Sequence, residues 1–389
     1  MGPLQGFKII EIAGIGPTQL CGMLFADMGA EIIRIERLSA ADTGVNIPQQ
    51  FNLMNRSRPA IAVDLKSPAG INFVLQLCES ADALFEGFRP GVMERLGLGP
   101  SECMARNQKL VFGRITGWGQ SGPLADSAGH DANYLGLSGA LSAIGEKDGL
   151  PILPLNLVAD FGGGALYLAT GLLAAILEAS KSGKGQVVDA AMIDGVASMM
   201  TLFQGLSAAG MWQEKRGANL LDGATPFYRT YATKDGKAIV VGAIERQFFK
   251  TLLAVLQIES IDPAEQFDVS KWPEHIKILE SRFMSESRDF WCNLLEGTDA
   301  CFAPVLDMSE AYEHPHNKAR DTFITVDGIP QSAPAPRFSR TESEIRSPAG
   351  AATPGNHEIL DSWGISPAEV LELERTGTLG AAEPRDKSE

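Results

Sequence analysis

Hydrophobic positions in the first 120 residues alternate between short continuous runs and longer stretches with helical spacing. Residues 7–14, 31–37 and 60–66 are rich in Ile, Val and Ala, which predicts buried strands. Residues 17–29 and 67–81 between them have the spacing of helices, and the second begins with Ser-Pro, a typical helix start. This alternation predicts a mainly parallel sheet with helices on its faces.

The pattern changes after residue 200. Residues 201–224 lose regular spacing and are predicted to be a linker, whereas 227–244 contain two β-type runs about Asp235-Gly236, a strong hairpin signal. Residues 330–354 predict an extended return, closed by one more helix near 357–376. The predicted fold is α/β, with a large Rossmann-like parallel-sheet domain (1–200 and 325–389) and a smaller α+β domain (225–324).

Composition narrows the classes of function. The net charge of -15 on 389 residues works against binding to nucleic acid or to an anionic membrane. The five cysteines form no CxxC pair, so we expect neither a zinc site nor a disulfide framework, and a reducing cytoplasm is the expected setting. His314 and His316 lack a third ligand nearby, so we expect no metal site there and an exposed loop around these histidines. No apolar run approaches the length of roughly 18 residues that a membrane-spanning helix needs, so no membrane insertion is expected.

Three glycines match a dinucleotide-binding pattern. Gly117, Gly119 and Gly122 follow the predicted strand 109–116 in the order G-x-G-x-x-G. Pro123 and a polar run stand where the helix of that motif should open, so a nicotinamide oxidoreductase is the weakest of the alternatives. We interpret these glycines as a Gly-rich loop beneath a ligand, and a plain turn is the alternative interpretation.

Basic residues gather at the predicted strand ends. Five cations stand against three acidic residues between positions 34 and 66, a local charge of +2 in an acidic chain. The cations are Arg34, Arg37, Arg56, Arg58 and Lys66, and Arg89 and Arg95 follow. Arginine binds phosphate through its fork of donors, so the cluster predicts a phosphate-bearing ligand, although any single residue fits a solvated surface charge equally well.

His130 and two carboxylates supply candidate acid-base chemistry. His130 stands with Asp131 at the predicted start of a helix, directly after the Gly-rich loop. Asp160 opens a second predicted helix, whose free N–H groups would stabilise its anion and could hold a developing oxyanion. One imidazole, one carboxylate and an oxyanion site suit proton abstraction next to a carbonyl group.

Five motifs carry a family resemblance that extends from residue 7 to about residue 340. They are GHDANY (129–134), PLNLVADFGGG (154–164), GKGQVVDAAMIDG (183–195), RGANLLDG (216–223) and VGAIERQF (241–248). In them the sequence resembles the α-methylacyl-CoA racemases of the family III CoA-transferase superfamily. The resemblance implies an enzyme that inverts the α-carbon of 2-methylacyl-CoA thioesters through an enolate, without a cofactor other than the CoA of the substrate.

The resemblance also implies residue roles and a partner. His130 and Asp160 would be the acid-base groups on opposite faces of the α-carbon, with Glu245 paired to the histidine and Asp131 beside the thioester. The residues implied to contact CoA are Arg37, Ala60, Val63, Lys66, Arg89, Arg95 and Tyr134. An interlocked homodimer is expected, in which each chain threads through its mate. Transferases of the superfamily use the aspartate that matches Asp160 as a nucleophile, and a CoA-transferase is therefore the alternative activity.

Overall fold

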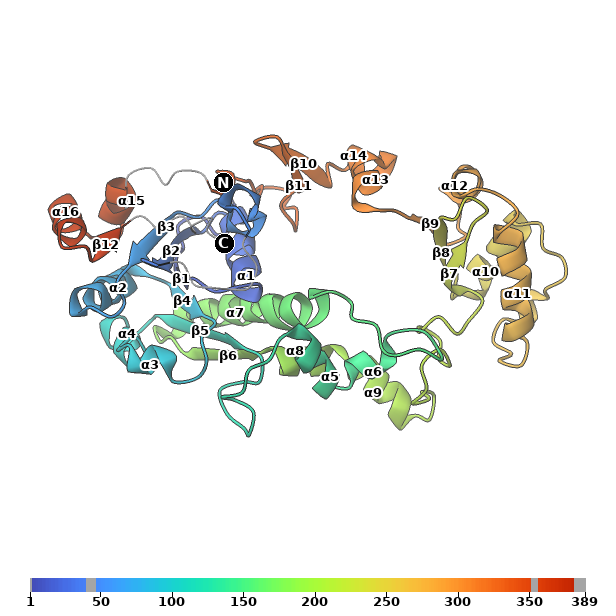
Figure 1. Ribbon diagram of the computed structural model, residues 1–389, viewed down its shortest axis with the longest axis horizontal. Coiled ribbons are helices and arrows are strands. Elements are labelled where there is room, and N and C mark those ends of the chain that lie inside the picture. Colours follow the sequence, from blue (N-terminus) through green and yellow to red (C-terminus); the bar gives the residue numbers. More distant parts are fainter. Residues whose placement is uncertain (1, 40–46, 351–355, 381–389) are drawn as a thin grey trace, which may run out of the picture. The chain divides into compact units, whose positions relative to one another are not determined.

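The computed structural model describes residues 2–39, 47–350 and 356–380. It divides into two compact units (Figure 1): Met1–Ser138, Leu155–Met199 and Asp321–Glu389 form the first, and Gly139–Pro154 and Met200–Arg320 form the second. Residues 139–154 therefore group with the second unit, whereas the sequence pattern assigned them to the large domain. The predicted linker contains a helix, α9 (Thr201–Ala208), in its first third.

A seven-stranded sheet forms the centre of the first unit. Its strands are β1 (Lys8–Ile12), β2 (Glu31–Arg37), β3 (Ala60–Val63), β4 (Ala83–Glu86), β5 (Val111–Thr116), β6 (Val187–Ala191) and β12 (Leu379–Gly380). They lie in the order β12-β3-β2-β1-β4-β5-β6, and all neighbours are parallel except β12 on β3. The predicted parallel sheet is confirmed. Strands β2 and β3 are added on one side of β1, and β4, β5 and β6 on the other, so the strand order reverses between β1 and β4. Open α/β sheets bind ligands at the carboxyl ends of the strands beside such a reversal.

The helices of the first unit largely follow the sequence pattern. They are α1 (Pro17–Asp27), α2 (Pro68–Ser80), α3 (Val92–Arg95), α4 (Pro100–Arg106), α5 (Asp131–Leu137), α7 (Leu166–Ser182), α8 (Met192–Met199), α15 (Asn356–Ser362) and α16 (Pro367–Arg375), with 3₁₀ turns at Gln49–Phe51 and Leu53–Asn55. The Ser67 hydroxyl accepts a hydrogen bond from the Gly70 N–H at 3.0 Å, which confirms the predicted cap of α2.

Two features near the C-terminus differ from the prediction. The single closing helix is two helices, α15 and α16. The stretch predicted as an extended return, 330–354, begins inside β11 (Ile329–Ser332), which forms a hairpin with the preceding β10 (Phe323–Val326). Asp327 and Gly328 form its turn with φ of 51° and 77°, the left-handed pair that an Asp-Gly turn requires.

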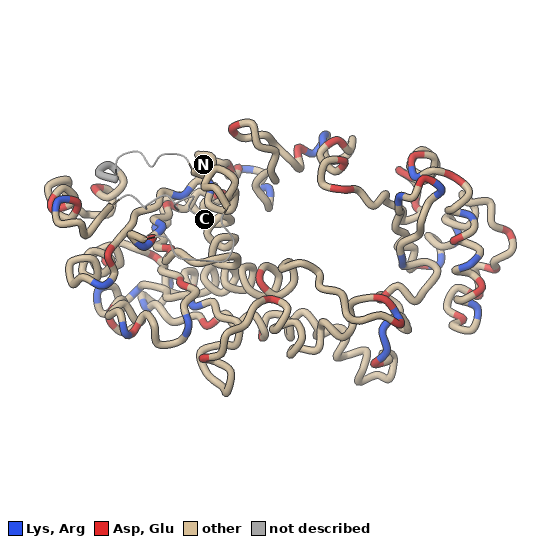
Figure 2. The backbone as a smooth tube through the Cα atoms, viewed as in Figure 1, with Lys and Arg blue, Asp and Glu red and all other residues tan. Residues whose placement is uncertain are grey.

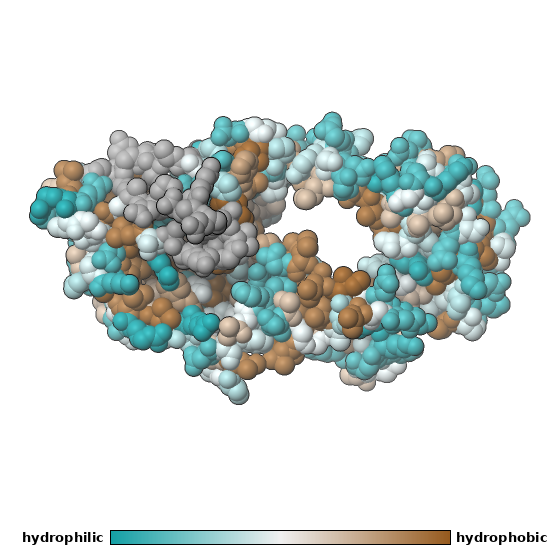
Figure 3. Space-filling view, viewed as in Figure 1, coloured by the Kyte–Doolittle hydropathy of each residue, from teal (hydrophilic) through white to brown (hydrophobic). Residues whose placement is uncertain are grey.

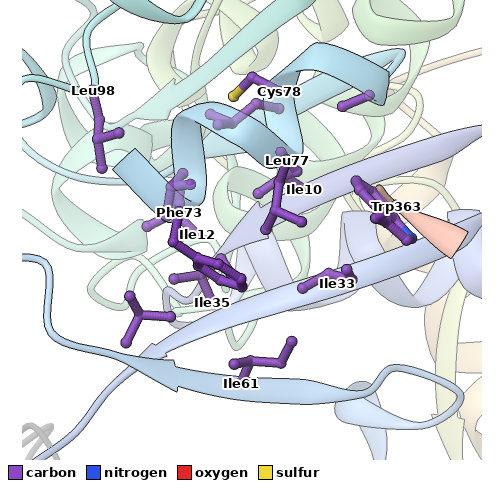
Figure 4. Packing of buried hydrophobic residues seen from close by; sticks show 14 of the residues in the cluster. Ile10, Ile12, Ile33, Ile35, Ile61, Phe73, Leu77, Cys78, Leu98 and Trp363 are labelled. Carbon is purple, nitrogen blue, oxygen red and sulfur yellow. The ribbon is translucent and has the colours of Figure 1, made fainter. Parts of the chain in front are cut away.

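The core of the first unit lies between the sheet and helix α2 (Figure 4). Ile10, Ile33 and Ile61 from three neighbouring strands belong to one buried cluster with Phe73 and Leu77 of α2, and all of these are at most 1% exposed. Burying one such side chain stabilises the folded state by roughly 1.5–3 kcal/mol. This packing explains why the strands read as continuous apolar runs.

One long apolar helix corrects the sequence analysis. The π-helix Leu157–Ala165 continues into α7, and the combined 26 residues contain an 18-residue window with a mean hydropathy of 1.5, so they are long and apolar enough by length and composition to cross a membrane. The tube of this helix, which lies in Figure 2 where Figure 1 labels α7, is mostly tan because few of its residues are charged. One face packs on the sheet, because a Cβ added to Gly113 of β5 would lie 2.9 Å from Leu172 and 3.0 Å from Leu168. We therefore interpret this helix as part of the core.

The second unit contains a three-stranded antiparallel sheet of β7 (Tyr228–Ala232), β8 (Ala238–Gly242) and β9 (Phe302–Val305). Its helices are α6 (Ala140–Ala143), α9, α10 (Arg246–Val255), α11 (Trp272–Phe283), α12 (Arg288–Leu295), α13 (Met308–Glu313) and α14 (Pro315–Ala319), with a 3₁₀ turn at Pro263–Glu265. The predicted hairpin at Asp235-Gly236 joins β7 to β8 and is confirmed. His314 precedes α14 and His316 lies within it, so this segment is helical and not a loop.

Candidate active site

Asp131 joins the two segments that carry His130 and Asp160. Helix α5 begins directly after His130, whose N–H donates to Asn133 Oδ1 at 2.9 Å and whose side chain is exposed. The Asp131 side chain is buried, and its Oδ2 accepts hydrogen bonds from the N–H groups of Ala159 at 2.8 Å and Asp160 at 2.9 Å. A single carboxylate therefore fixes the start of α5 against the π-helix.

The carboxylate that accepts hydrogen bonds from the first turn of the π-helix is that of Asp131. This corrects the sequence-based interpretation, in which these N–H groups stabilise the anion of Asp160. Asp160 lies within the π-helix, and the N–H groups expected to stabilise its anion or an oxyanion are bonded to Asp131. Burial raises the pKa of Asp160, and the negative charge of Asp131 raises it further. A hydrogen bond from Asn156 Nδ2 to Asp160 Oδ2 at 3.2 Å and the nearby charge of His130 act in the opposite direction. Asp160 is therefore a more basic carboxylate than the sequence indicated.

The three glycines after Asp160 allow the π-helix to pack directly on α8. A Cβ at Gly163 would lie 2.8 Å from the backbone nitrogen of Val196, and a Cβ at Gly195 would lie 1.9 Å from the carbonyl oxygen of Gly163. Only glycines permit this backbone-to-backbone contact, which holds the turn that carries Asp160 in place.

Tyr134 covers the Gly-rich loop. A Cβ at Gly117 would lie 2.0 Å from the Tyr134 ring, which also makes an edge contact with Trp118 at a centroid distance of 4.8 Å. Burial raises the pKa of Tyr134 to about 12, the charge of Asp160 adds to this effect and that of Arg89 opposes it. The next helix after the loop begins only at Asp131. The loop therefore lacks the helix that a dinucleotide-binding motif needs, and it lies against the candidate site.

Three arginines of the basic cluster are structural. Arg34 and Arg58 both pair with the buried carboxylate of Glu11, at 3.4 Å and 3.2 Å. Arg56 pairs with Asp27 at 2.5 Å. All three guanidinium groups are buried or nearly so, and together they pair the two buried carboxylates of Glu11 and Asp27, which would be costly to leave unpaired in the core. They are unavailable to a ligand, which corrects part of the predicted phosphate site.

The other cations of the predicted CoA site are exposed. Arg37 ends β2 and stands 5.6 Å from the ring centroid of Phe88, and Lys66 follows β3. Arg89 and Arg95 follow β4. These positions lie at or beyond the carboxyl ends of the parallel strands β2, β3 and β4, the edge at which such sheets bind ligands.

The two apolar residues of the predicted CoA site lie at opposite ends of β3. Val63 pairs with Arg37 at the carboxyl end, but its side chain is only 1% exposed. Ala60 begins the strand and pairs with Arg34. Val63 can offer its backbone at the ligand edge, and Ala60 lies away from that edge.

Glu86 is a buried acid that the sequence analysis missed. It ends β4, is 2% exposed, accepts a hydrogen bond from the Phe88 N–H at 2.6 Å and faces Arg114 Nε at 3.6 Å. Burial raises its pKa to about 7. A carboxylate at the end of an apolar run that meets the ligand edge is the signal that could have identified it. Its bond to Phe88 supports the loop that carries Arg89.

Replacing Glu86 by glutamine is expected to remove a pH-dependent contribution to stability. The unfolded pKa is near 4.5 and the folded pKa near 7, so the folded state retains a proton that the unfolded state releases. The unfolding free energy of the parent should therefore fall, relative to Glu86→Gln, by about 3 kcal/mol as pH rises from 4.5 to 7. Urea titrations of both proteins across this range measure the difference. If the unfolding free energies of the parent and Glu86→Gln change equally with pH, the prediction is wrong. Glu79→Gln, at a half-exposed carboxylate, is the control.

Glu245 belongs to the second unit. It precedes α10, its carbonyl oxygen accepts hydrogen bonds from Phe248 and Phe249, and its side chain is exposed. Burial raises the pKa of the Cys301 thiol, and the negative charge of the Glu245 carboxylate raises it further. The pairing of Glu245 with His130, a residue of the first unit, stays a prediction.

The residues described in ranges 2–39, 47–350 and 356–380 contain no cluster of three or more His, Cys, Asp or Glu side chains that could hold a metal ion.

The chain belongs to CoA-transferase family III, whose sequence model matches residues 4–358. It is 43% identical to the α-methylacyl-CoA racemase of Mus musculus over 95% of this chain and 96% of that protein, and 39% identical to the α-methylacyl-CoA racemase of Homo sapiens over the same shares. The succinyl-CoA:glutarate CoA-transferase of Homo sapiens is 30% identical over 89% of this chain and 83% of that protein. A CAIB/BAIF family protein from Brucella suis has a similar fold, with a TM-score of 0.77 at 25% identity over 93% of this chain and 99% of that structure.

Proposed function

We propose that the protein is a racemase that inverts the α-carbon of 2-methylacyl-CoA thioesters by transferring protons through an enolate. The observation that carries the proposal is the link through Asp131, which holds the elements of His130 and Asp160 together. Burial, with a further contribution from the charge of Asp131, raises the pKa of Asp160 and suits it to act as a base. The identity to two α-methylacyl-CoA racemases over nearly the whole chain supports the choice of substrate class.

In this mechanism His130 and Asp160 serve opposite faces of the α-carbon. One group removes the α-proton and the other returns a proton to the opposite face, so each ends the turnover in the protonation state in which the other began. A carboxylate with a raised pKa is a stronger base, and its conjugate acid is retained more readily near neutral pH. The thioester acidifies its own α-hydrogen, so the proposal needs no cofactor beyond the CoA of the substrate.

The enolate oxygen needs hydrogen-bond donors. The N–H groups of Ala159 and Asp160 are bonded to Asp131, and they are not free for this role. The N–H groups of Asp131 and Ala132, in the first turn of α5, have no acceptor within the described part of the chain. We assign the enolate oxygen to this turn, where backbone donors meet the positive end of the helix.

Arg37 and Arg89 are proposed to contact the phosphates of CoA. Arg37→Ala and Arg89→Ala are each expected to raise KM for the acyl-CoA, by about tenfold and more steeply as salt increases, because an exposed ion pair to phosphate is screened. The phosphates are bound equally in the ground and transition states, so kcat should change much less. Steady-state kinetics at two ionic strengths measure both constants. Unchanged KM values in both variants would remove the assignment, and Arg106→Ala, at an exposed arginine paired with Glu79, is the control.

A CoA-transferase that uses Asp160 as an acyl-accepting nucleophile is the second candidate. The partial exposure of Asp160 and the similarity to the human succinyl-CoA:glutarate CoA-transferase favour it. Proton NMR of a single-epimer 2-methylacyl-CoA in D₂O separates the two. Loss of the α-proton signal together with epimerisation supports racemisation. Acyl transfer to a free acid, with an enzyme-bound acyl group trapped by hydroxylamine, supports the transferase and overturns the first proposal.

We also propose that the protein is an interlocked homodimer and acts in a reducing cytoplasm. The second unit exposes apolar side chains, among them Leu150 at 86% and Met211 at 71%, and α9 buries no residue. Figure 3 shows apolar side chains at the surface among hydrophilic ones. Such surfaces are typical of subunit interfaces.

Threading of one chain through another should make folding depend on assembly. Unfolding midpoints are expected to rise with protein concentration, and dilution should yield no folded monomer, because the interface is part of the folded state. Sedimentation velocity combined with thermal unfolding over a hundredfold range of concentration tests this. A stable, active monomer would exclude the interlocked dimer.

A further inference from the structure

The loop after β1 lies directly against the Asp160 carboxylate. Gly16 has φ of +63°, and a Cβ added there would stand 3.2 Å from Asp160 Oδ2. The Gly16 N–H donates to the side-chain oxygen of Gln19 at 3.0 Å. The backbone of Gly16 thus covers one side of the carboxylate, and the Gln19 amide holds that backbone.

The hydrogen bonds of Gln19 determine how its amide is oriented. A backbone N–H can only donate, so Oε1 faces Gly16 and Nε2 faces the opposite way. Nε2 donates to Asn55 Oδ1 at 3.0 Å and to Asn52 Oδ1 at 3.3 Å. Gln19 is 6% exposed, so these bonds are largely shielded from water. Both ends of the side chain are therefore anchored.

The anchor extends into the charged core of the sheet. Arg58 donates to the Gln19 carbonyl oxygen at 2.9 Å and to Asn55 Oδ1 at 3.2 Å, and it pairs with the fully buried Glu11 of β1. Gly22 of α1 leaves room for the guanidinium group, since a Cβ there would lie 2.3 Å from Arg58 Nη1. A continuous buried polar network thus joins Glu11 to the loop that touches Asp160.

We propose that Gln19 is a positioning residue for Asp160, whose amide holds Gly16 against the carboxylate and keeps that side of it away from water. The inference rests on the proposed racemase function. Burial is the largest cause of the raised pKa of Asp160, so a loop that moves away should hydrate the carboxylate and lower that pKa. Gln19 makes no contact with the reacting atoms in this proposal and acts only through Gly16.

Gln19→Met preserves the volume of the side chain and removes its hydrogen bonds. We expect deuterium exchange from the Asp160-facing epimer to slow by about tenfold, because small displacements of a catalytic base have large effects on rate. The acidic limb of its pH–rate profile should move to lower pH, while exchange from the His130-facing epimer and KM change by less than about twofold. Gln19→Glu retains an acceptor for the Gly16 N–H but loses the bonds donated to Asn52 and Asn55, so it should restore only part of the rate.

The control is Gln331→Met, because Gln331 is a 5% exposed glutamine whose Oε1 accepts from Arg56 Nη1 in the same unit. It should lose stability without changing either pH profile. If the parent exchanges neither epimer, the proposed function fails. If the parent exchanges both and Gln19→Met slows both equally or leaves the Asp160 profile in place, the positioning role is overturned and the racemase proposal stands.

Discussion

Replacing His130 or Asp160 by alanine is expected to stop α-proton exchange from one epimer each. His130→Ala should lower exchange on the histidine side by about 10²- to 10⁴-fold, the usual contribution of a general base, and leave the Asp160 side active. Asp160→Ala should do the reverse, because the surviving base still removes a proton from its own face. Both variants should lose net inversion. Proton NMR of each pure epimer in D₂O measures the two rates separately.

Matched variants and the transferase alternative make this prediction decisive. His316→Ala, at an exposed histidine of the second unit, should leave both rates unchanged. Glu245→Gln should slow the histidine side more than the Asp160 side, because a paired carboxylate favours the imidazolium that forms there. A transferase would lose activity in Asp160→Ala and keep acyl transfer in His130→Ala. Inversion at close to the parent rate in His130→Ala would refute the two-base mechanism.

Replacing Asp131 by alanine should affect both stability and catalysis. The variant leaves the N–H groups of Ala159 and Asp160 without their acceptor, which costs on the order of 3–6 kcal/mol for two hydrogen bonds to a charged group, one buried and one partly buried. The π-helix then loses its connection to α5, and exchange on the Asp160 side should fall by about a hundredfold or more. Urea denaturation and the single-epimer exchange assay measure the two effects.

Asp131→Asn separates geometry from charge. Its amide oxygen can still accept both hydrogen bonds, so most of the stability should be retained. The negative charge that raises the pKa of Asp160 is gone, so this pKa should fall and the acidic limb on the Asp160 side should move to lower pH. Asp307→Ala, which removes an exposed helix cap in the second unit, should change stability alone. An alanine variant with parent stability and parent exchange rates would show that the Asp131 link has no role.

Local patterns in the sequence predicted most of the first unit. The apolar runs around Ile10, Ile33 and Ile61 read as buried strands because each strand lies inside a parallel sheet covered on both faces. Ser67 and the Asp235-Gly236 turn were predictable because capping and tight turns depend on a few neighbouring residues. The same rule applied to Asp327-Gly328 would have predicted the second hairpin.

The sequence also determined the residue types of the candidate site and their order along the chain. GHDANY and VADFGGG supplied an imidazole, two carboxylates and a glycine run, and these define the acid-base chemistry whatever the fold. Spacing along the chain could not indicate which carboxylate is hydrogen-bonded and which is the base. Asp131 and Asp160 are separated by 28 intervening residues, and only folding brings the Asp160 N–H to the Asp131 oxygen.

Only the tertiary structure decided how the charges are used. Arg34, Arg56 and Arg58 looked like ligand-binding cations, but folding buries them beside Glu11 and Asp27, where an unpaired carboxylate would be costly. The contact between Gly16 and Asp160 likewise joins segments 144 positions apart, and no local pattern encodes it. Burial and pairing depend on which distant segments meet. The sequence therefore specified the chemical groups, and the tertiary structure determined their environments and their roles.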